Sequence, residues 1–227
     1  MAGEYSSRSR SRRQHELEER AMEKNQVVKS ERFGPVIYFR ISGPGKSDKV
    51  MKLIDFPEAR QFHDYDCGVA AMWTVMSYYG LDVREDEIMK LAEPDEEDGT
   101  NPSGLVKAGK EHGLEGVEKK ATVEWLREML DRGVPVLMLV QAWPEDADDH
   151  DWSGWDNGHW VVAIGYDRDG RIYFMDPASP VRTWLDEDEL YERWHSYGEG
   201  DEKTDHYALF FRGRKPAFGW SKFDHMD

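Results

Sequence analysis

The amino-acid sequence predicts an α+β domain in which a helical half comes first and an antiparallel sheet follows. Between residues 68 and 132, apolar residues recur with helical spacing and glycines stand where helices should end. After Gly133 the pattern changes to short apolar runs separated by turn residues, which is typical of strands. Hydrophobic residues make up 39% of the 227-residue chain, which is enough for one domain with a sizeable core.

The two ends of the chain differ from this central part in composition. Residues 1–32 hold eight Lys and Arg and six Asp and Glu but few large apolar residues. We therefore expect a charged, flexible tail there, with a polar helix over Gln14–Gln26. We expect the folded domain to span residues 33–215 and a C-terminal tail to span residues 216–227.

The first elements of the domain lead up to a buried helix. Two short strands are expected at Val36–Ile41 and Val50–Ile54. A polar loop then precedes a helix over Gly68–Tyr79, which Asp66 can cap and Gly80 can end. This helix is apolar on nearly every side, and such a helix belongs inside a protein.

The remaining elements complete the helical half and then build the sheet. Three more helices are expected, at Arg84–Leu91, Ser103–His112 and Thr122–Arg132. The β half is expected to contain one short helix, Asp186–Trp194, and five strands: Pro135–Val140, His159–Tyr166, Arg171–Met175, Val181–Leu185 and His206–Phe211. The turn Asp167–Gly170 indicates that the second and third of these strands are an antiparallel pair.

The charge and hydropathy of the chain disfavour some classes of function. Thirty Lys and Arg against 46 Asp and Glu give a formal net charge of −16, which argues against nucleic acid as a partner because phosphate backbones are bound through cations. The longest apolar runs, Val134–Val140 and Trp160–Gly165, are far shorter than the ~20 residues that cross a bilayer, so no membrane span is predicted. The basic N-terminus is not followed by the apolar stretch that a signal peptide needs, and we therefore expect a cytoplasmic protein.

Cys67 is the only cysteine, which excludes an intramolecular disulfide and a cysteine-rich zinc site. A lone cysteine is most often a small buried hydrophobe. The position of Cys67 at the start of a buried helix supports a second interpretation, because backbone N–H groups and the helix dipole favour a thiolate there. Gly68 beside it is expected to leave room for a substrate to approach the sulfur. Cys67 is therefore a candidate nucleophile.

Three more residues have the chemistry that a cysteine nucleophile needs. His159 is expected to begin a core strand and can act as general base and then as general acid. Asp176 ends the next strand, so antiparallel pairing of the two strands would bring its carboxylate near His159 and let it orient the ring. Gln61, six residues before Cys67, can donate a hydrogen bond to an oxyanion, with the Cys67 backbone N–H as a second donor.

The sequence Gln61-x5-Cys67-Gly68, followed by His159-Trp160-Val161-Val162 and Asp176-Pro177, resembles the C39 peptidases and their C39-like relatives. These enzymes are papain-like cysteine peptidases, and the resemblance covers roughly Phe56 to Arg212. It implies a papain-like fold with Cys67 as nucleophile, His159 as base and acid, Asp176 as orienting residue and Gln61 as oxyanion-hole donor. It also implies a peptide or protein substrate and no cofactor.

The resemblance leaves alternatives open. The best-known C39 domains sit at the N-terminus of an ABC exporter and cut leader peptides after a Gly-Gly pair. This sequence has no transmembrane region and no Walker A motif, so we expect a stand-alone unit, and double-glycine specificity does not follow. An acyltransferase or amidase would use the same residues, and some relatives only bind peptides. His63 and His206 are rivals of His159 for the role of base.

We expect the substrate cleft to be acidic and walled by a long loop. The residues expected to contact substrate are Gly68, Trp160, His63 and Asp66. The segment Trp143–Gly158 is expected to form a lid or wall over the cleft. Its run Pro144–Asp151 lacks the glycine and terminal Glu of an EF-hand loop, so no metal site is predicted. Together with Glu93–Asp98, this segment makes the cleft acidic, which favours cationic substrates.

Overall fold

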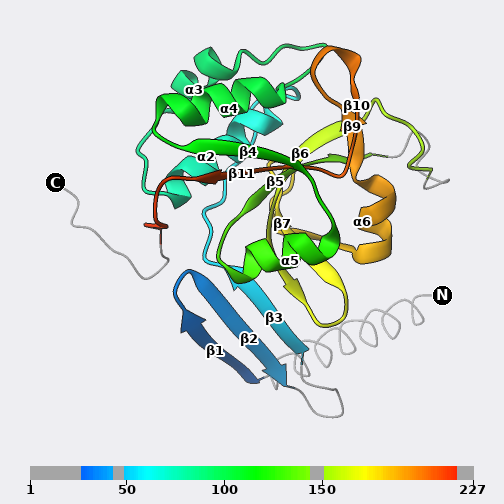
Figure 1. Cartoon of the computed structure of the whole chain (residues 1–227). Coiled ribbons are helices and arrows are strands. Elements are labelled where there is room, and N and C mark those ends of the chain that lie inside the picture. Colours follow the sequence, from blue (N-terminus) through cyan, green and yellow to red (C-terminus); the bar gives the residue numbers. More distant parts are fainter. Residues whose placement is uncertain (1–26, 43–48, 144–150, 219–227) are drawn as a thin grey trace, which may run out of the picture.

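The structure is a computed structural model that describes residues 27–42, 49–143 and 151–218 (Figure 1). Its helices are α2 (Cys67–Tyr78), α3 (Glu85–Ala92), α4 (Pro102–Glu111), α5 (Val123–Asp131), α6 (Glu187–Arg193) and the short 3-10 helix η1 (Glu199–Asp201). Its strands are β1 (Val27–Phe33), β2 (Val36–Ser42), β3 (Lys49–Ile54), β4 (Glu115–Lys120), β5 (Val136–Gln141), β6 (Gly158–Asp167), β7 (Arg171–Met175), β8 (Thr183–Asp186), β9 (His195–Tyr197), β10 (Lys203–Asp205) and β11 (Tyr207–Arg212). The α+β class expected from the sequence is confirmed.

Strand β6 lies at the centre of a nine-stranded antiparallel sheet. The order is β1-β2-β3-β6-β5-β11-β4, and β7 pairs with β6 and with β8. Strand β7 pairs with one edge of β6, along residues 162–166. Two strands share the other edge of β6: β5 pairs with residues 158–163 and β3 with residues 165–167. A separate two-stranded sheet contains β9 and β10. The start of β6 is therefore enclosed by β5 on one side and by the end of β7 on the other.

Helix α2 lies in the core and packs against β6, α3 and α4. Ten of its 12 residues are buried, in agreement with its apolar surface on every side. Figure 1 shows α2, α3 and α4 gathered at one end of the molecule and α5 apart from them, near β3. Burying one large apolar side chain contributes ~1.5–3 kcal/mol, so the burial of α2 holds its first turn firmly in place.

Each helix and strand expected within the described residues is present, with bounds within two residues of the expected ones. Four strands had no counterpart in the expectations: β1, β4, β9 and β10. Strands β9 and β10 are three residues long, and β4 is a mostly polar edge strand. None of these three strands shows the apolar alternation that marks a strand in a sequence. The charged residues 27–32, which we assigned to the N-terminal tail, instead belong to β1, where backbone pairing with β2 extends the sheet.

The C-terminal boundary also differs from the expected one. The backbone N–H groups of Ala217 and Phe218 donate to the Tyr78 carbonyl at 2.9 and 3.1 Å, so residues 217 and 218 close over the end of α2 instead of starting a tail. Residues 219–227 and the helix expected over Gln14–Gln26 lie outside the described residues. In the part of the chain that the structure describes, no helix has the length and apolar character needed to cross a membrane.

Candidate active site

The loop before α2 fixes Cys67 at the first position of the helix. Both carboxylate oxygens of Asp66 accept the His63 backbone N–H, at 3.0 and 3.1 Å, and this closes the loop on itself. Asp66 is the N-cap residue, but its side chain makes no capping hydrogen bond, so the expectation that it caps the helix was wrong. Buried Asp66 holds the loop through His63 N–H, and the thiol that follows is also buried.

His159 and Asp176 meet where β6 begins and β7 ends. Val162 pairs with Met175 in the antiparallel ladder, which places Asp176, the next residue, at the His159 end of β6. The Nε2 atom of His159 lies 2.8 Å from Oδ1 of Asp176, and the His159 side chain is almost completely buried. Asp176 Oδ1 also accepts the backbone N–H of Ala178 at 3.0 Å, which fixes the carboxylate in turn.

Electrostatics in this buried pair favour an imidazolium. Burial of the His159 ring favours its neutral form, but hydrogen bonds to Asp176 and to the Cys67 thiol outweigh burial and raise the pKa of His159 to about 9. Burial alone would raise the pKa of Asp176, but the hydrogen bond with His159 holds that pKa below its usual value. Because Nε2 faces Asp176, Nδ1 is the ring nitrogen left for Cys67.

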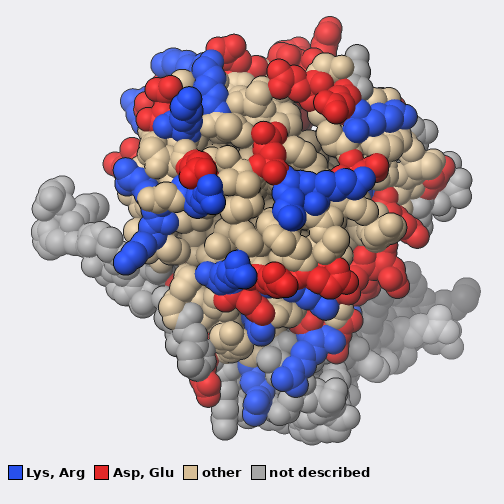
Figure 2. Space-filling model, in the orientation of Figure 1, with Lys and Arg blue, Asp and Glu red and all other residues tan. Residues whose placement is uncertain are grey.

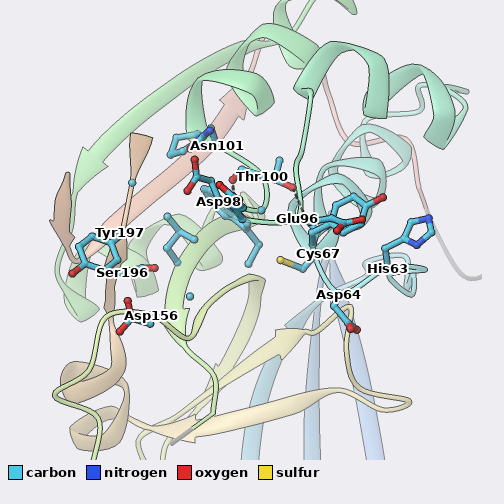
Figure 3. Close-up of a pocket in the computed structure, with 18 of the residues that line it drawn as sticks. His63, Asp64, Cys67, Glu96, Asp98, Thr100, Asn101, Asp156, Ser196 and Tyr197 are labelled. Atoms are coloured by element: carbon cyan, nitrogen blue, oxygen red, sulfur yellow. Dashed lines mark hydrogen bonds between the residues drawn. The ribbon is translucent and has the colours of Figure 1, made fainter. Parts of the chain in front are cut away.

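Cys67 opens onto a cavity of about 750 Å³. Figure 3 shows the sulfur directed into this space, with Thr100 and Asn101 on one side and Ser196 and Tyr197 opposite. These side chains come from the α3–α4 connection and from β9, so the cavity is walled by segments that are far apart in the sequence. The thiol is therefore buried in the fold yet accessible to a molecule that enters the cavity.

A family model for the peptidase C39-like family matches residues 53–202 of the chain. The chain belongs to this family. The comparison also supports the resemblance that the spacing of Gln61, Cys67, His159 and Asp176 suggested. No curated protein sequence matched the chain.

Two solved structures of C39 peptidase domains have the same fold. The peptidase domain of Streptococcus ComA, a bifunctional ABC transporter of a quorum-sensing pathway, is 22% identical, with a TM-score of 0.52 over 70% of this chain and 97% of that one. A double-glycine motif protease from an AMS/PCAT transporter, solved with its leader peptide, is 21% identical, with a TM-score of 0.50 over 71% of this chain and 92% of that one. The C39-like chain thus has the expected papain-like fold.

Acidic side chains dominate the cavity of this C39-like domain. Five carboxylates line it, and no lysine or arginine does so among the residues that the structure describes; the five are Asp64, Glu96, Glu97, Asp98 and Asp156. Figure 2 shows acidic side chains gathered along the upper edge of the molecule, where Figure 1 places the α3–α4 connection and the β9–β10 hairpin. The described lining agrees with the acidic cleft expected from the sequence.

Gly68 has a different role from the one we expected. A Cβ atom there would lie 2.6 Å from Thr100 Cβ and 2.8 Å from Trp160 Cδ1, so the space beside Gly68 is filled by the protein and not left for substrate. Trp160 donates its Nε1–H to the Thr100 carbonyl at 2.8 Å and lines the cavity, as expected of a substrate contact. Gly68 lets this pair pack directly against the first turn of α2.

Gln61 lies beside the turn that follows Asp176. Its backbone N–H donates to the Pro177 carbonyl at 3.1 Å, and its side-chain Nε2 donates to the His63 carbonyl at 2.9 Å. One amide hydrogen on Nε2 remains for another acceptor. The side-chain oxygen, Oε1, is buried and has no hydrogen-bond partner among the described residues. The role of Gln61 as an oxyanion donor stays a prediction.

The two rival histidines lie elsewhere. His63 lines the cavity, but Figure 3 shows its ring directed away from the Cys67 sulfur, and it stacks on Tyr65 with ring centroids 5.1 Å apart. His206 packs between Tyr191 and Trp194, with centroid distances of 4.8 and 5.2 Å. His159 is the histidine whose pKa is raised by its interactions with Asp176 and Cys67.

The described part of the Trp143–Gly158 segment forms a wall of the cavity. Trp155, Asp156 and Gly158 line the cavity, and the Trp143 ring lies 5.1 Å from the His159 ring between centroids. The acidic run Pro144–Asp151, in which the sequence predicts no calcium loop, falls largely within residues 144–150, outside the described part. Among the described residues, no group of three or more His, Cys, Asp and Glu side chains could hold a metal ion.

Two polar residues that support this wall were not expected from the sequence. Gln141, which is buried at the end of β5, donates to the carbonyls of Trp155 and His195 and accepts the Asn157 N–H, at 3.3, 3.1 and 3.1 Å. A glutamine that closes an otherwise apolar strand was the available signal. Ser196 lines the cavity from β9, and because β9 was not predicted, no pattern indicated it.

Proposed function

We propose that the chain is a cysteine peptidase that cleaves a peptide or amide bond through an acyl-enzyme on Cys67. The observation that carries the proposal is the hydrogen-bonded series from Cys67 through His159 to Asp176 at the edge of an open cavity. Membership of the C39-like family supports it. So does the neighbour described as a double-glycine motif protease bound to a leader peptide, since that protein takes a peptide in the same fold.

The reaction begins with proton transfer within the buried pair. Cys67 gives its proton to Nδ1 of His159, and the resulting imidazolium is held by the Asp176 carboxylate at Nε2. The raised pKa of His159, about 9, keeps the ring protonated at neutral pH, which favours the thiolate beside it. The first turn of α2 stabilises the same negative charge through its N–H groups and dipole.

The thiolate then attacks the carbonyl carbon of the scissile bond. A C–S bond forms, and the carbonyl electron pair moves onto oxygen to give a tetrahedral oxyanion. The Cys67 backbone N–H is one donor to this oxyanion, because the first N–H groups of a helix have no intrahelical acceptor. The remaining amide hydrogen of Gln61 Nε2 is the second donor in this proposal, provided that the side chain turns toward the cleft when substrate binds.

Collapse of the oxyanion releases the amine product. The C–N bond breaks as the His159 imidazolium gives its proton to the leaving nitrogen, and the acyl group remains on Cys67 as a thioester. Neutral His159 then takes a proton from water, whose oxygen attacks the thioester carbon to give a second tetrahedral oxyanion. When this oxyanion collapses, the C–S bond breaks and the His159 imidazolium returns its proton to the Cys67 sulfur. The acid product leaves, and the thiol and imidazole are restored. Asp176, whose side chain is 16% exposed, holds the ring orientation through both halves of the reaction.

Alkylation of Cys67 tests the proposal without knowledge of the substrate. Iodoacetamide should modify the wild-type protein at pH 6–7 much faster than N-acetylcysteine, because a free thiol with a pKa of ~8.5 is then mostly protonated. Whole-protein mass spectrometry reads one site, since the chain has one cysteine. His159→Ala should move the pH profile toward that of the free thiol, whereas the matched His63→Ala variant should leave it unchanged.

Two results would count against this assignment. Alkylation that stays fast and acid-shifted in His159→Ala would remove His159 as the partner of Cys67. Turnover at the wild-type rate in Cys67→Ala, measured on any peptide that the protein cleaves, would end the acyl-enzyme proposal altogether. We expect that variant to lose turnover and to keep peptide binding.

A further inference from the structure

The carboxylates of the cavity are not neutralised within the described part of the chain. No ion pair is found there for Asp64, Glu96, Glu97, Asp98 or Asp156, although salt bridges occur over the rest of the surface. Lys203 lies over the Trp155 ring at 4.7 Å from its centroid, but it does not line the cavity. Like charges gathered around one cavity repel one another and attract a cation from outside.

Ser196 adds a polar group to the wall of the cavity. The residue is 3% exposed and lines the cavity from β9. Figure 3 shows this oxygen directed into the cavity from the wall opposite Cys67. A Cβ atom on Gly158 would lie 2.2 Å from Ser196 Oγ, so the hydroxyl sits directly beside the residue that precedes His159. A serine hydroxyl at the cavity wall can accept a hydrogen bond from a bound ligand.

We propose that the substrate is a peptide carrying a lysine or arginine close to the scissile bond, and that this cavity holds the basic side chain. Glu96, Glu97 and Asp98 contribute charge from the α3–α4 connection, and Asp156 contributes charge from the opposite wall. Ser196 supplies an uncharged acceptor on the same wall as Asp156. The inference rests on the proposed peptidase function, since it places the scissile carbonyl at Cys67.

The shape of the cavity suits an extended cationic side chain. Apolar surface from Trp155 and Trp160 lies beside the carboxylates, and the methylene stem of lysine or arginine can pack on such surface while its charged end meets the acids. The cavity volume of about 750 Å³ exceeds what one side chain needs, so neighbouring residues of the peptide can enter as well.

Peptide binding to the Cys67→Ala variant tests the inference separately from turnover. The probes are fluorescein-labelled octapeptides that carry lysine, its uncharged isostere norleucine, or glutamate at one position, which is moved through all eight positions. At 20 mM NaCl, at least one lysine peptide should bind about tenfold or more tighter than its norleucine counterpart by fluorescence anisotropy. The preference should shrink at 500 mM NaCl, where exposed charges are screened over a few ångströms.

Matched variants assign the preference to the cavity. The variant Glu96→Gln/Glu97→Gln/Asp98→Asn changes three exposed side chains, so it should fold, and it should bring the lysine-to-norleucine ratio close to one. The control variant Glu111→Gln/Glu128→Gln/Glu192→Gln removes the same charge from exposed positions outside the cavity lining and should keep the ratio. Ser196→Ala should weaken binding of the lysine peptide several-fold.

The outcomes separate this inference from the proposed function. Equal binding of lysine and norleucine peptides, a preference that survives neutralisation of the three acids, or no binding by any peptide would overturn the cationic specificity. If Cys67→Ala binds the lysine peptides selectively but the wild-type protein cleaves none of them, the cation-binding cavity stands and the peptidase proposal fails. Cleavage of norleucine peptides as fast as lysine peptides would leave the peptidase and remove the specificity.

Discussion

Replacing Asp176 by Asn isolates the effect of one carboxylate on the buried pair. Asn has nearly the same shape and keeps an oxygen that can accept the Ala178 N–H, but it removes the negative charge 2.8 Å from His159 Nε2. A hydrogen bond to a charged partner is worth ~1.5–3 kcal/mol, and one pH unit in a pKa corresponds to ~1.4 kcal/mol. The substitution should therefore lower the pKa of His159 by about one to two pH units.

The sign of the effect on Cys67 follows from this change. In the wild-type protein the His159 pKa of about 9, raised from an ordinary 6.5, keeps the imidazolium present throughout the neutral range, and it is lost only as the pH rises through that pKa. In Asp176→Asn the imidazolium is lost at lower pH, so less thiolate is held beside it. Alkylation by iodoacetamide should therefore slow by about twofold at most at pH 7 and by more at pH 8, and catalysis should fall without disappearing.

Two measurements check this prediction. Carbon-detected NMR of histidine labelled at Cε1 follows the His159 titration directly, with the signal assigned by its loss in His159→Ala. Intact-protein mass spectrometry gives the alkylation rate across pH. Asp188→Asn, at an exposed position in α6, is the matched control and should change neither result. An unchanged His159 pKa in a folded Asp176→Asn protein would refute the assignment of Asp176 as the orienting residue.

Three other substitutions test how the site is built. Gly68→Ala places a Cβ atom 2.6 Å from Thr100 Cβ and should lower the free energy of unfolding by about 1–3 kcal/mol in urea titration; no loss relative to Ser77→Ala in the same helix would contradict the packing role. Gln141→Ala leaves its backbone partners unpaired, which costs about 1–3 kcal/mol, and should speed hydrogen exchange at residues 153–157; unchanged exchange would mean that the wall is held otherwise. Gln61→Ala should lower kcat about 100-fold on a cleaved peptide with little change in KM, and an unaltered kcat would remove it from the oxyanion hole.

The positions of the proposed catalytic residues could be predicted because regular helices and strands present them. Cys67 begins a helix whose apolar surface is visible in the sequence, and His159 begins a strand that is a continuous apolar run. The turn Asp167–Gly170 fixes β6 and β7 as an antiparallel pair, and Asp167 Oδ1 accepts the N–H groups of Asp169 and Arg171 within it. The hydrophobic period of an element, the residues of a turn and the spacing of motif residues are local properties, so they can be read from a single sequence.

The parts that were missed depend on contacts between distant segments. Gly68 was read as open space for substrate because the sequence gives no sign that Thr100, 32 positions further on, fills that space. Strand β1 pairs with β2 along its whole length, but its sequence VVKSERF lacks the apolar alternation that marks a strand. Ser196 reaches the cavity from a three-residue strand that has no recognisable period. Each of these depends on tertiary context, which overrides local propensity.

The difference between the buried elements and the exposed loops bears on substrate specificity. The proposed nucleophile and base stand on α2 and β6, which are buried and change little when an exposed side chain is replaced. The carboxylates that face them come from an exposed connection between α3 and α4 and from a segment held at its base by Gln141 and by Arg193, whose guanidinium lies 4.0 Å from the Trp152 ring. Exposed loops tolerate substitution far better than core elements do. Substrate preference can therefore change here by substitutions in two loops while the reaction is kept, and for this reason the acidic wall, more than the shared catalytic residues, should decide which peptides this chain accepts.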